Sequence, residues 1–314
     1  MKAAVLNTLP GNLDIEDVQI DSPGPHEVLI RTSAAGLCHS DLHFMEAKYP
    51  YMTPAVLGHE SAGIVEAVGS EVTYVKPGDH VITCLSVFCG QCDFCISGRP
   101  NLCTKEATRR APDAPQRLSR NGDPVFQFLD LSSFAEQMLV HEGAVVKIRD
   151  DMPLDRAALI GCGVTTGVGA VLNTASVRAG ETVAVIGCGG VGLSAIQGAA
   201  IAGAGRIIAV DMVDMKLKLA ESFGATDLVN AKEGDPVGQV LDMTGGRRRA
   251  GGSSRRARRG RGAGAAPGGR RSRRRRAPGG GGRGSRGRRP RPRARRRAAT
   301  RGGTRWRGRR RRSS

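Results

Sequence analysis

Four cysteines, Cys89, Cys92, Cys95 and Cys103, are the residues whose spacing says most about chemistry. They stand in the stretch FCGQCDFCISGRPNLC, separated by two, two and seven residues. Four thiolates that converge on one ion and close a tetrahedron are typical of a structural Zn²⁺ site. A disulfide pair or an iron–sulfur cluster are the alternatives, but disulfides are rare in reducing compartments and ferredoxin runs have other spacings. We therefore predict structural zinc in a lobe of residues 88–104.

A second set of residues predicts a metal site of a different kind. Cys38, His59 and Cys162 stand in the stretches GLCHSDLH, GHESAG and IGCGVTTG. Three protein ligands leave a fourth position for water or substrate, which is typical of catalytic zinc. Taken singly, each is more often a buried thiol or an ordinary histidine, but beside the four-cysteine lobe they form a specific constellation. Cys84 and Cys188 have no such partners, and we expect them to be small buried thiols.

These pieces together resemble a known family. Residues 1–246 are similar to a zinc-containing, class III-like alcohol dehydrogenase of the medium-chain dehydrogenase/reductase superfamily. The matching pieces are GLCHSDLH, GHESAGIVEAVGSEV, KPGDHVI, the four-cysteine lobe, GCGVTTG and GCGGVG, all in family order. The resemblance implies an oxidoreductase with one catalytic and one structural zinc per chain, which oxidises an alcohol to an aldehyde or ketone with hydride transfer to NAD. It also implies a homo-oligomer, and it leaves the alcohol or aldehyde unidentified.

The same resemblance implies roles for residues around the catalytic metal. Ser40 would contact the substrate oxygen. His43 would be the outer end of a proton relay to solvent, a role that suits histidine because its usual pKa lies near neutrality. Asp41 would orient His59, as metal-bound imidazoles usually require. Glu60 would adjoin the zinc and assist exchange of its ligands.

The dinucleotide site is predicted from the stretch GCGGVG, which follows a β-branched run and opens a small-residue helix. Its residues are Gly187, Gly189, Gly190, Val191 and Gly192. Glycines at this spacing permit a tight turn and let a pyrophosphate approach a helix N-terminus. Asp211, 24 residues after Gly187, can accept hydrogen bonds from ribose hydroxyls and favours NAD over NADP. By resemblance, Lys216 is a second ribose contact and His39 faces the pyrophosphate.

The elements that must position these residues change in character near Val164. Short strands broken by glycine and proline come first, and the expected ones are Glu27–Ala35, Ala62–Val68 and His80–Thr83. For residues 1–163 the resemblance implies a GroES-like β-barrel catalytic domain. Strands and helices then alternate, which predicts an α/β fold with a parallel, doubly wound Rossmann sheet in residues 164–246.

The expected Rossmann elements are three strands and three helices: Thr182–Ile186, Val191–Ala202, Arg206–Val210, Met215–Phe223, Asp227–Val229 and Pro236–Met243. Three strands supply only the adenosine half of such a domain, so we expect it to be partial. The composition of Thr182–Ile186 predicts a strand buried on both faces. Its position predicts an unpaired apolar edge, which is an aggregation hazard.

Composition separates residues 247–314 from the rest. The chain carries +19 overall, but this tail holds 30 arginines and no acidic residue or lysine, which leaves −11 on residues 1–246. Because the tail lacks Leu, Ile, Val, Phe and Met, we predict that it is disordered. It is either an arm that binds nucleic acid non-specifically by charge, in a protein whose zinc lobe is structural, or the product of a shifted GC-rich reading frame. We favour the frameshift and expect the chain to be poorly active or inactive.

The amino terminus, MKAAVLNTLP, has too short an apolar stretch for a signal peptide, and no run approaches transmembrane length. We therefore expect a cytoplasmic protein that acts on a small alcohol or aldehyde and has no membrane partner.

Overall fold

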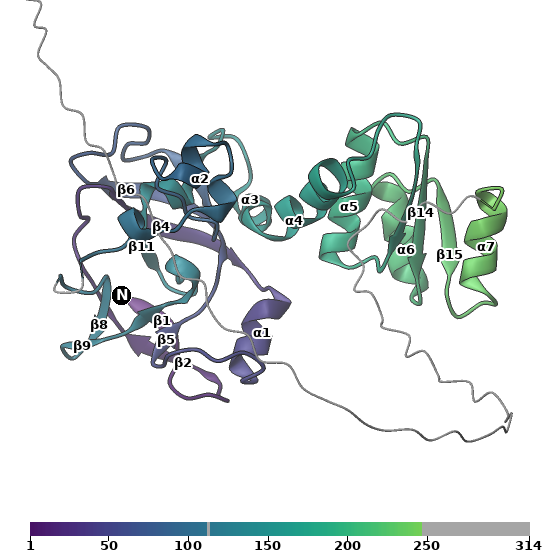
Figure 1. The fold of residues 1–314 in the computed structure, drawn as a ribbon. Helices are drawn as coiled ribbons and strands as arrows, with labels where there is room; N and C mark the ends of the chain where they lie inside the picture. Colours follow the sequence, from purple (N-terminus) through teal and green to yellow (C-terminus); the bar gives the residue numbers. More distant parts are fainter. Residues whose placement is uncertain (112–113, 247–314) are drawn as a thin grey trace, which may run out of the picture. The chain divides into compact units, whose positions relative to one another are not determined.

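The structure is a computed structural model that describes residues 1–111 and 114–246 (Figure 1). The predictions made for residues 247–314 lie outside the described residues and stay predictions. Mainly antiparallel sheets occur up to Lys147, with one parallel pairing between Phe126–Gln127 and Ala55–Val56, and a fully parallel sheet begins at Thr182. The expected domain boundary at residues 163 and 164 falls at the start of helix α4, Gly163–Gly169.

The antiparallel part is built around a five-stranded sheet whose order is β11-β4-β6-β7-β12. Its strands are β4 (Glu27–Gly36), β6 (Glu60–Val68), β7 (His80–Thr83), β11 (Gln137–His141) and β12 (Val145–Lys147). The three expected strands are thus confirmed, two of them with ends one or two residues further out. Val28, Ile30, Val65 and Val81 of this sheet pack in one buried cluster. The sheet therefore anchors His59, the residue that directly precedes β6.

Two smaller sheets complete this part. The first has the order β10-β5-β1-β2 and the second the order β3-β8-β9. Their strands are β1 (Lys2–Leu6), β2 (Leu13–Asp17), β3 (Gln19–Ile20), β5 (Ala55–Val56), β8 (Leu118–Arg120), β9 (Asp123–Pro124) and β10 (Phe126–Gln127). Leu6, Ala55, Leu57 and Phe128 form a buried cluster beside the first of these sheets. Strand β5 matters for the site because it leads, three residues later, to His59.

Short helices carry the ligand-bearing segments. They are α1 (His39–Met45), α2 (Asp93–Ile96), α3 (Leu154–Ala157), the 3₁₀ helix η5 (Ala158–Gly161) and α4. Cys38 is the N-cap of α1, Cys92 is the N-cap of α2, and Cys162 is the N-cap of α4. Each of these cysteines therefore sits at an irregular point of the backbone, where its direction is set by local hydrogen bonds.

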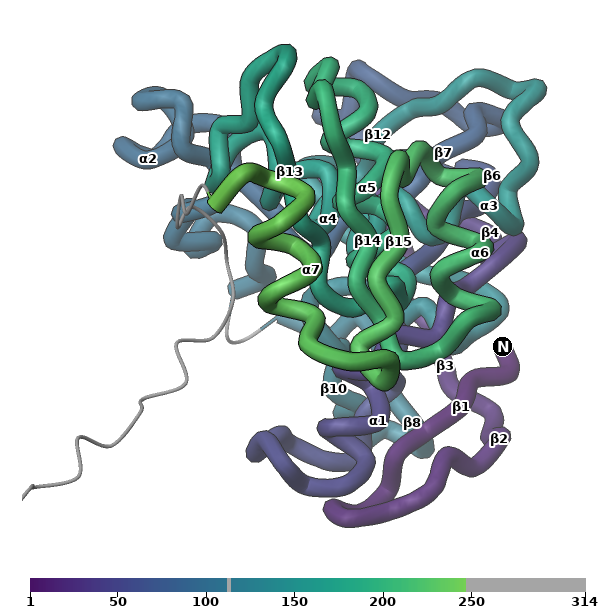
Figure 2. The backbone as a smooth tube through the Cα atoms, turned by 90° about the vertical axis from the view of Figure 1, so that its right-hand side faces the viewer, coloured from purple at the N-terminus to yellow at the C-terminus, as the bar shows by residue number. Residues whose placement is uncertain are grey.

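The parallel sheet has the order β13-β14-β15, and every predicted element of it is present. The elements are β13 (Thr182–Ile186), α5 (Gly190–Ile201), β14 (Arg206–Asp211), α6 (Asp214–Ser222), β15 (Asp227–Asn230) and α7 (Pro236–Met243). Helices α5 and α6 pack against Val185, Ile207 and Ala209 on one face. Helix α7 packs on Ile208 and Val229 on the other face, and Figure 2 shows it beside β14. The predicted doubly wound fold is confirmed within the described residues.

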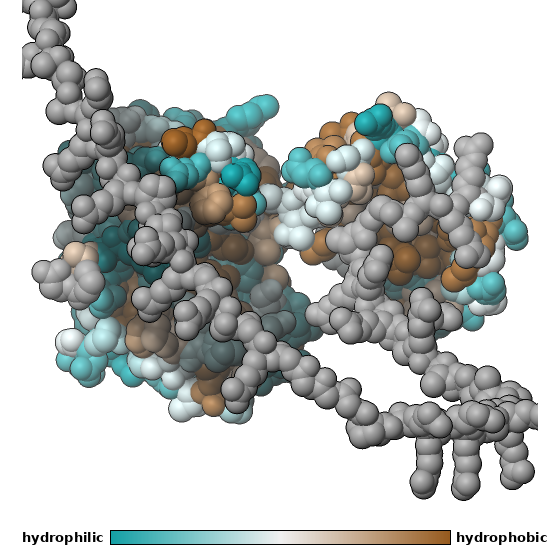
Figure 3. Space-filling view, viewed as in Figure 1, coloured by the Kyte–Doolittle hydropathy of each residue, from teal (hydrophilic) through white to brown (hydrophobic). Residues whose placement is uncertain are grey.

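The prediction that Thr182–Ile186 is buried on both faces is wrong. Val185 packs against α5, but Ile186 is 79% exposed, and Thr182 and Ala184 are exposed as well. The reason is that α7 reaches only β14 and β15, so nothing in residues 1–111 and 114–246 covers the second face of this edge strand. Figure 3 shows hydrophobic residues on the surface of the part of the molecule that contains the parallel sheet. The predicted unpaired edge of β13 is confirmed for the described part of the chain.

Within the described ranges, no single helix is long and apolar enough to cross a membrane. A bent pair, Leu154–Gly161 followed by Gly163–Thr174 at 52°, reaches the necessary length and composition only when the two helices are taken together.

Candidate functional site

The four cysteines of the predicted lobe converge as expected. The Sγ atoms of Cys89, Cys92, Cys95 and Cys103 all lie within 4.8 Å of one another, and the individual Sγ–Sγ distances include 3.5, 3.6, 3.8 and 4.0 Å. Zn–S bonds of about 2.3 Å in a tetrahedron place sulfurs roughly 3.8 Å apart. A disulfide would bring two of them to about 2.05 Å, and all four are free thiols. The geometry therefore fits a tetrahedral metal and excludes the disulfide alternative.

Local backbone geometry explains this convergence. Gly90 and Gly98 both have φ of 77°, a left-handed conformation that glycine adopts without a steric penalty. Amide N–H groups of the lobe point at the sulfurs: Cys92 N donates to Cys89 Sγ (3.4 Å) and Cys89 N donates to Cys103 Sγ (3.3 Å). The backbone hydrogen bond from Cys95 outweighs burial and lowers the pKa of the Cys92 thiol to about 6. Burial and the contact with Cys92 raise the pKa of Cys95 to about 11. The backbone of the lobe thus favours the thiolate of Cys92, the form that binds a metal.

The second predicted set also meets. One ligand atom each from Cys38, His59, Glu60 and Cys162 lies within 4.8 Å of the others. His59 is 1% exposed and Glu60 is 5% exposed, and both cysteines are partly buried. Glu60 also accepts a hydrogen bond from Gly163 N at 3.2 Å, which ties it to the segment that carries Cys162. Two thiols and an imidazole are ligands that suit zinc, and Glu60 is the further residue that the sequence placed beside them.

Asp41 connects two of the ligands. It is 4% exposed, and its Oδ1 accepts hydrogen bonds from His59 Nδ1 and from Gly58 N, each at 3.2 Å. Its Oδ2 accepts from Cys38 N at 3.1 Å. Because Asp41 accepts the Nδ1 proton, the tautomer of His59 leaves Nε2 free to bind a metal. Asp41 therefore lies where the predicted role, orienting the His59 ring, requires a hydrogen-bond acceptor.

The protonation of the ligands depends on the same contacts. Burial lowers the pKa of His59, but the hydrogen bond to Asp41 and the contact with Cys162 outweigh it and raise the pKa to about 11. Burial raises the pKa of the Cys38 thiol, yet the backbone N–H and hydroxyl of Ser40, with the nearby His59, lower it on balance. These contacts thus favour the thiolate form of Cys38 and hold on His59 a proton that a metal ion would displace.

The predicted relay residues lie on α1 next to this cluster. Ser40 Oγ is 3.6 Å from Cys38 Sγ, so the hydroxyl is adjacent to the metal ligands. His43 is partly buried, and its ring meets the exposed His39 edge to face, with centroids 4.5 Å apart. His43 also meets the ring of Tyr49 at 5.9 Å. The structure therefore brings Ser40 to the cluster and places His43 beside the exposed His39 of the same helix.

The glycine run forms the turn between β13 and α5. Gly187 has φ of 94°, and a Cβ atom on Gly192 would lie 1.8 Å from the Gly187 carbonyl oxygen. By contrast, Cβ atoms on Gly189 and Gly190 would meet nothing within 4 Å, and the Val191 side chain is about half exposed. Gly187 and Gly192 are thus needed to close the turn, whereas Gly189 and Gly190 leave the start of the helix open to a ligand.

Asp211 ends β14 beside this turn. Its Oδ2 accepts a hydrogen bond from Cys188 N at 2.7 Å, and its Oδ1 accepts from Met212 N and Val213 N at 2.7 and 3.0 Å. These contacts, that of Cys188 first, hold the pKa of Asp211 below its usual value, with a smaller contribution from Lys216. A carboxylate oxygen has more than one lone pair, so both oxygens keep acceptor capacity for ribose hydroxyls.

The prediction that Cys84 and Cys188 are buried thiols holds for only one of the two. Cys188 is 1% exposed, as expected of a small buried thiol. For Cys84 the same expectation is wrong, because it directly follows the end of β7 and is only partly buried.

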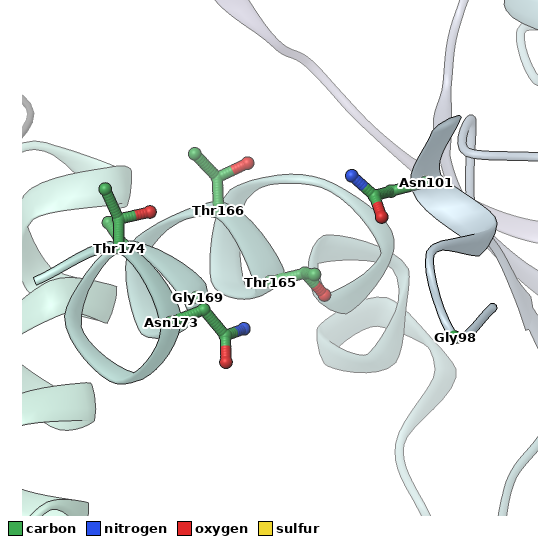
Figure 4. Close-up of a pocket in the computed structure, with 8 residues that line it drawn as sticks. Gly98, Asn101, Thr165, Thr166, Gly169, Asn173 and Thr174 are labelled. Carbon is green, nitrogen blue, oxygen red and sulfur yellow. The ribbon is translucent and has the colours of Figure 1, made fainter. Parts of the chain in front are cut away.

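The sequence did not single out two buried features, one at the site and one elsewhere in the antiparallel part. Phe128, which is 0% exposed, packs edge to face against His59 with centroids 5.7 Å apart. Glu27 forms a buried ion-pair network with Arg110 and Arg117, which lie 83 and 90 residues further along the chain. A pocket lined by Gly98, Asn101, Thr165, Thr166, Gly169, Ala170, Asn173 and Thr174 contains none of the candidate ligands, and we assign it no role (Figure 4).

Two family profiles match the chain. Residues 24–150 match "Alcohol dehydrogenase GroES-like domain", and residues 190–249 match "Zinc-binding dehydrogenase". The chain is 46% identical over 253 residues to alcohol dehydrogenase class-3 of Zea mays, an alignment that covers 78% of this chain and 66% of the maize protein. It is 45% identical over 255 residues to S-(hydroxymethyl)glutathione dehydrogenase of Saccharomyces cerevisiae, with the same coverage. This chain thus spans slightly less than two thirds of the length of these relatives.

Solved structures agree with the sequence matches. An alcohol dehydrogenase zinc-binding domain protein from Burkholderia ambifaria superposes with a TM-score of 0.73 at 41% identity, over 78% of this chain and 68% of that one. Benzyl alcohol dehydrogenase from Acinetobacter calcoaceticus superposes with a TM-score of 0.71 at 37% identity, over 78% and 67%. These matches confirm the predicted combination of GroES-like and Rossmann folds.

Proposed function

Because the chain belongs to the zinc-binding alcohol dehydrogenase family, we propose that it oxidises an alcohol to an aldehyde or ketone and transfers the hydride to NAD. The observation that carries the proposal is the meeting of Cys38, His59 and Cys162 in one partly buried cluster. Three ligands of this kind leave a coordination position open, unlike the four thiols of the structural lobe.

We assign the residues as follows. Cys38, His59 and Cys162 would hold the catalytic zinc, and Cys89, Cys92, Cys95 and Cys103 the structural zinc. Zinc in an open site supplies a Lewis acid that lowers the pKa of an alcohol. Ser40 would accept the hydroxyl proton of the substrate, since its Oγ lies next to Cys38 Sγ. His43 would carry that proton outward, Asp41 would hold His59, and Glu60 would approach the metal during ligand exchange.

The cofactor half of the proposal uses the turn between β13 and α5. The open side of Gly189 and Gly190 at the N-terminus of α5, together with Val191, would receive the pyrophosphate, with His39 as a further contact. Asp211 would bind the adenosine ribose, with Lys216 as its second contact. A carboxylate in this position would repel a 2′-phosphate, so NAD is preferred over NADP.

Only the names of the related proteins indicate which classes of substrate to test. Those named above include an S-(hydroxymethyl)glutathione dehydrogenase and a benzyl alcohol dehydrogenase. A primary alcohol and a thiol adduct of formaldehyde therefore both belong in the test panel. A homo-oligomer, a cytoplasmic location and the domain division at residues 163 and 164 are parts of the proposal that come from the family resemblance and the sequence.

The proposal is tested on the purified 314-residue chain by elemental analysis, NAD binding and NADH formation. We expect two zinc equivalents, of which Cys38→Ser removes one, and NAD binding that does not require the alcohol. Because the described sheet has three strands, turnover should be slow, but any alcohol-dependent NADH formation should disappear in Cys38→Ser. A chain with no zinc that depends on Cys38, or with no affinity for NAD, would refute the proposal.

A further inference from the structure

The segment from Phe128 to Phe134, here called the Phe128 loop, holds the backbone that leads to His59. Three hydrogen bonds connect them: Ser132 Oγ to the Val56 carbonyl (2.8 Å), Ser133 N to the Gly58 carbonyl (3.1 Å) and Phe134 N to the Leu57 carbonyl (3.0 Å). Each of the three residues before His59 is therefore bound to the same loop. A displacement of the loop would shift the imidazole.

Phe128 acts on the imidazole ring itself. Its ring is fully buried and meets His59 edge to face, and it also packs against Tyr51 and Phe44 with centroids 5.3 and 4.8 Å away. Edge-to-face contacts prefer one relative orientation of the two rings. The imidazole is thus held by the Asp41 carboxylate at Nδ1 and by the Phe128 ring beside it.

The Phe128 loop adopts an unfavourable backbone conformation. Leu129, Asp130 and Ser132 have φ of 52°, 63° and 64°, and none of them is glycine. Aspartate tolerates the left-handed region, but leucine has no local hydrogen bond that would compensate for it. Such conformations persist only when surrounding contacts fix them. The loop therefore depends on partners outside itself.

Lys105 is such a partner. It stands two residues after Cys103, the last cysteine of the four-cysteine lobe. Its backbone N–H donates to Cys103 Sγ at 3.3 Å. Its Nζ donates to Asp130 Oδ2 at 3.0 Å and to the Leu85 carbonyl at 3.2 Å. One residue thus contacts a ligand of the structural lobe with its backbone and the strained Phe128 loop with its side chain.

We propose that Lys105 and Asp130 are positioning residues through which the structural lobe holds the Phe128 loop, and with it His59, in the geometry that binds the catalytic metal. The inference rests on the proposed function only in taking Cys38, His59 and Cys162 as the ligands of that metal. The Lys105 and Asp130 side chains are 29% and 30% exposed, and pairs this accessible add little to global stability. Their removal should relax the loop without unfolding the protein.

The test measures zinc affinity on the full chain by competition with a chromophoric chelator. Zinc should leave in two steps, and the step that is missing in Cys38→Ser belongs to the Cys38, His59 and Cys162 cluster. The variants are Lys105→Met, Asp130→Asn and the two combined. Asparagine also tolerates positive φ, so Asp130→Asn removes the charge without adding backbone strain. Lys105→Arg retains the cation, and Lys2→Met removes an exposed lysine that pairs with Asp17.

We expect Lys105→Met and Asp130→Asn each to weaken the Cys38-dependent step by about 5- to 10-fold. This is less than the 10- to 100-fold typical of a direct partner of a metal ligand, because the pair acts through the loop. The combined variant should lose no more than either single one, and Lys105→Arg should recover most of the affinity. Lys2→Met should match the unsubstituted chain, and the four-cysteine step should stay within about 2-fold throughout.

An unchanged Cys38-dependent step in Lys105→Met would overturn the inference. Equal weakening of both steps would also overturn it, because it would show a general loss of structure. Additive losses in the combined variant would overturn it too, because they would show that the two residues act separately. If the unsubstituted chain has no Cys38-dependent step, the proposed function fails instead, so the two failures are distinguishable.

Discussion

Glu27→Gln is the substitution for which the structure gives the clearest magnitude. The Glu27 side chain is 6% exposed and accepts hydrogen bonds from Arg117 Nε at 2.7 Å, from Arg110 Nη2 at 2.6 Å and from Gly24 N at 2.8 Å. Arg117 is itself 9% exposed. Glutamine would leave this guanidinium buried without a counter-charge, and breaking a buried ion pair in this way costs about 3–5 kcal/mol of folding free energy.

The pKa of Glu27 leads to a similar magnitude for the same interaction. Burial raises the pKa of Glu27, but Arg110, Gly24 and Arg117 outweigh it and lower the pKa from 4.5 to about 2. A pKa that is lower in the folded state contributes stability above pH 4.5, and this stability is lost as pH falls toward 2. The difference corresponds to roughly 3 kcal/mol at 1.36 kcal/mol per pH unit, which agrees with the cost of the substitution.

Urea unfolding at a series of pH values, followed by tyrosine circular dichroism, measures both quantities. All three tyrosines lie in residues 49–74, so their signal reports on the part of the chain that contains Glu27. We expect Glu27→Gln to lose about 3 kcal/mol at pH 7 and to show a shallower loss of stability in acid than the unsubstituted chain. Asp17→Asn, which removes an exposed pair with Lys2, is the control and should change little. A loss below about 1 kcal/mol, or parallel acid profiles, would refute the reasoning.

Four further outcomes are expected, three from the described residues and the last from the sequence of residues 247–314. Cys89→Ser should lose about one zinc equivalent and much stability, whereas Cys38→Ser should lose the other with less unfolding, as elemental analysis and thermal melting would show. Gly192→Ala should abolish NAD binding in a calorimetric titration, since its Cβ would clash with the Gly187 carbonyl, whereas Gly189→Ala should fold normally. Asp211→Gly should raise the use of NADP relative to NAD, and it should also weaken binding of both because Cys188 N loses its acceptor. Deletion of residues 247–314 should remove salt-sensitive, sequence-independent binding to DNA without removing zinc, and Trp306→Ala should not affect that binding.

The sequence predicted those parts of the site whose chemistry depends on residue type and short spacing. Cys89 to Cys103 can converge because a few residues of chain separate them, and the strand, turn and helix around Gly187 follow from local pattern alone. Burial of β13 was not predictable from its composition, because it depends on what lies beside the strand. Whether an apolar strand is central or at an edge is a property of the sheet.

Contacts between distant charges and rings were also beyond the sequence. Glu27 lies 83 residues from Arg110 and 90 from Arg117, and no periodic pattern relates them. Phe128 stands among apolar residues and is indistinguishable from any other core position until its ring is found against His59. Lys105 is one of many charged residues with no distinguishing motif. Such residues are recognised only when the fold brings them to a site.

The proposed catalytic cluster shows why a short motif was nevertheless informative. Its proposed ligands, Cys38, His59 and Cys162, all stand at backbone irregularities, where helix or strand propensity does not fix their direction. One carboxylate, that of Asp41, accepts hydrogen bonds from Cys38 N, from Gly58 N and from His59 Nδ1. Residues Cys38 to Asp41 thus form the N-terminal turn of α1. The Asp41 carboxylate caps this turn at Cys38 N and at the same time accepts a hydrogen bond from the His59 imidazole. The spacing within GLCHSDLH follows from this geometry, since a carboxylate one position earlier or later would leave that face of the helix and lose the contact with His59.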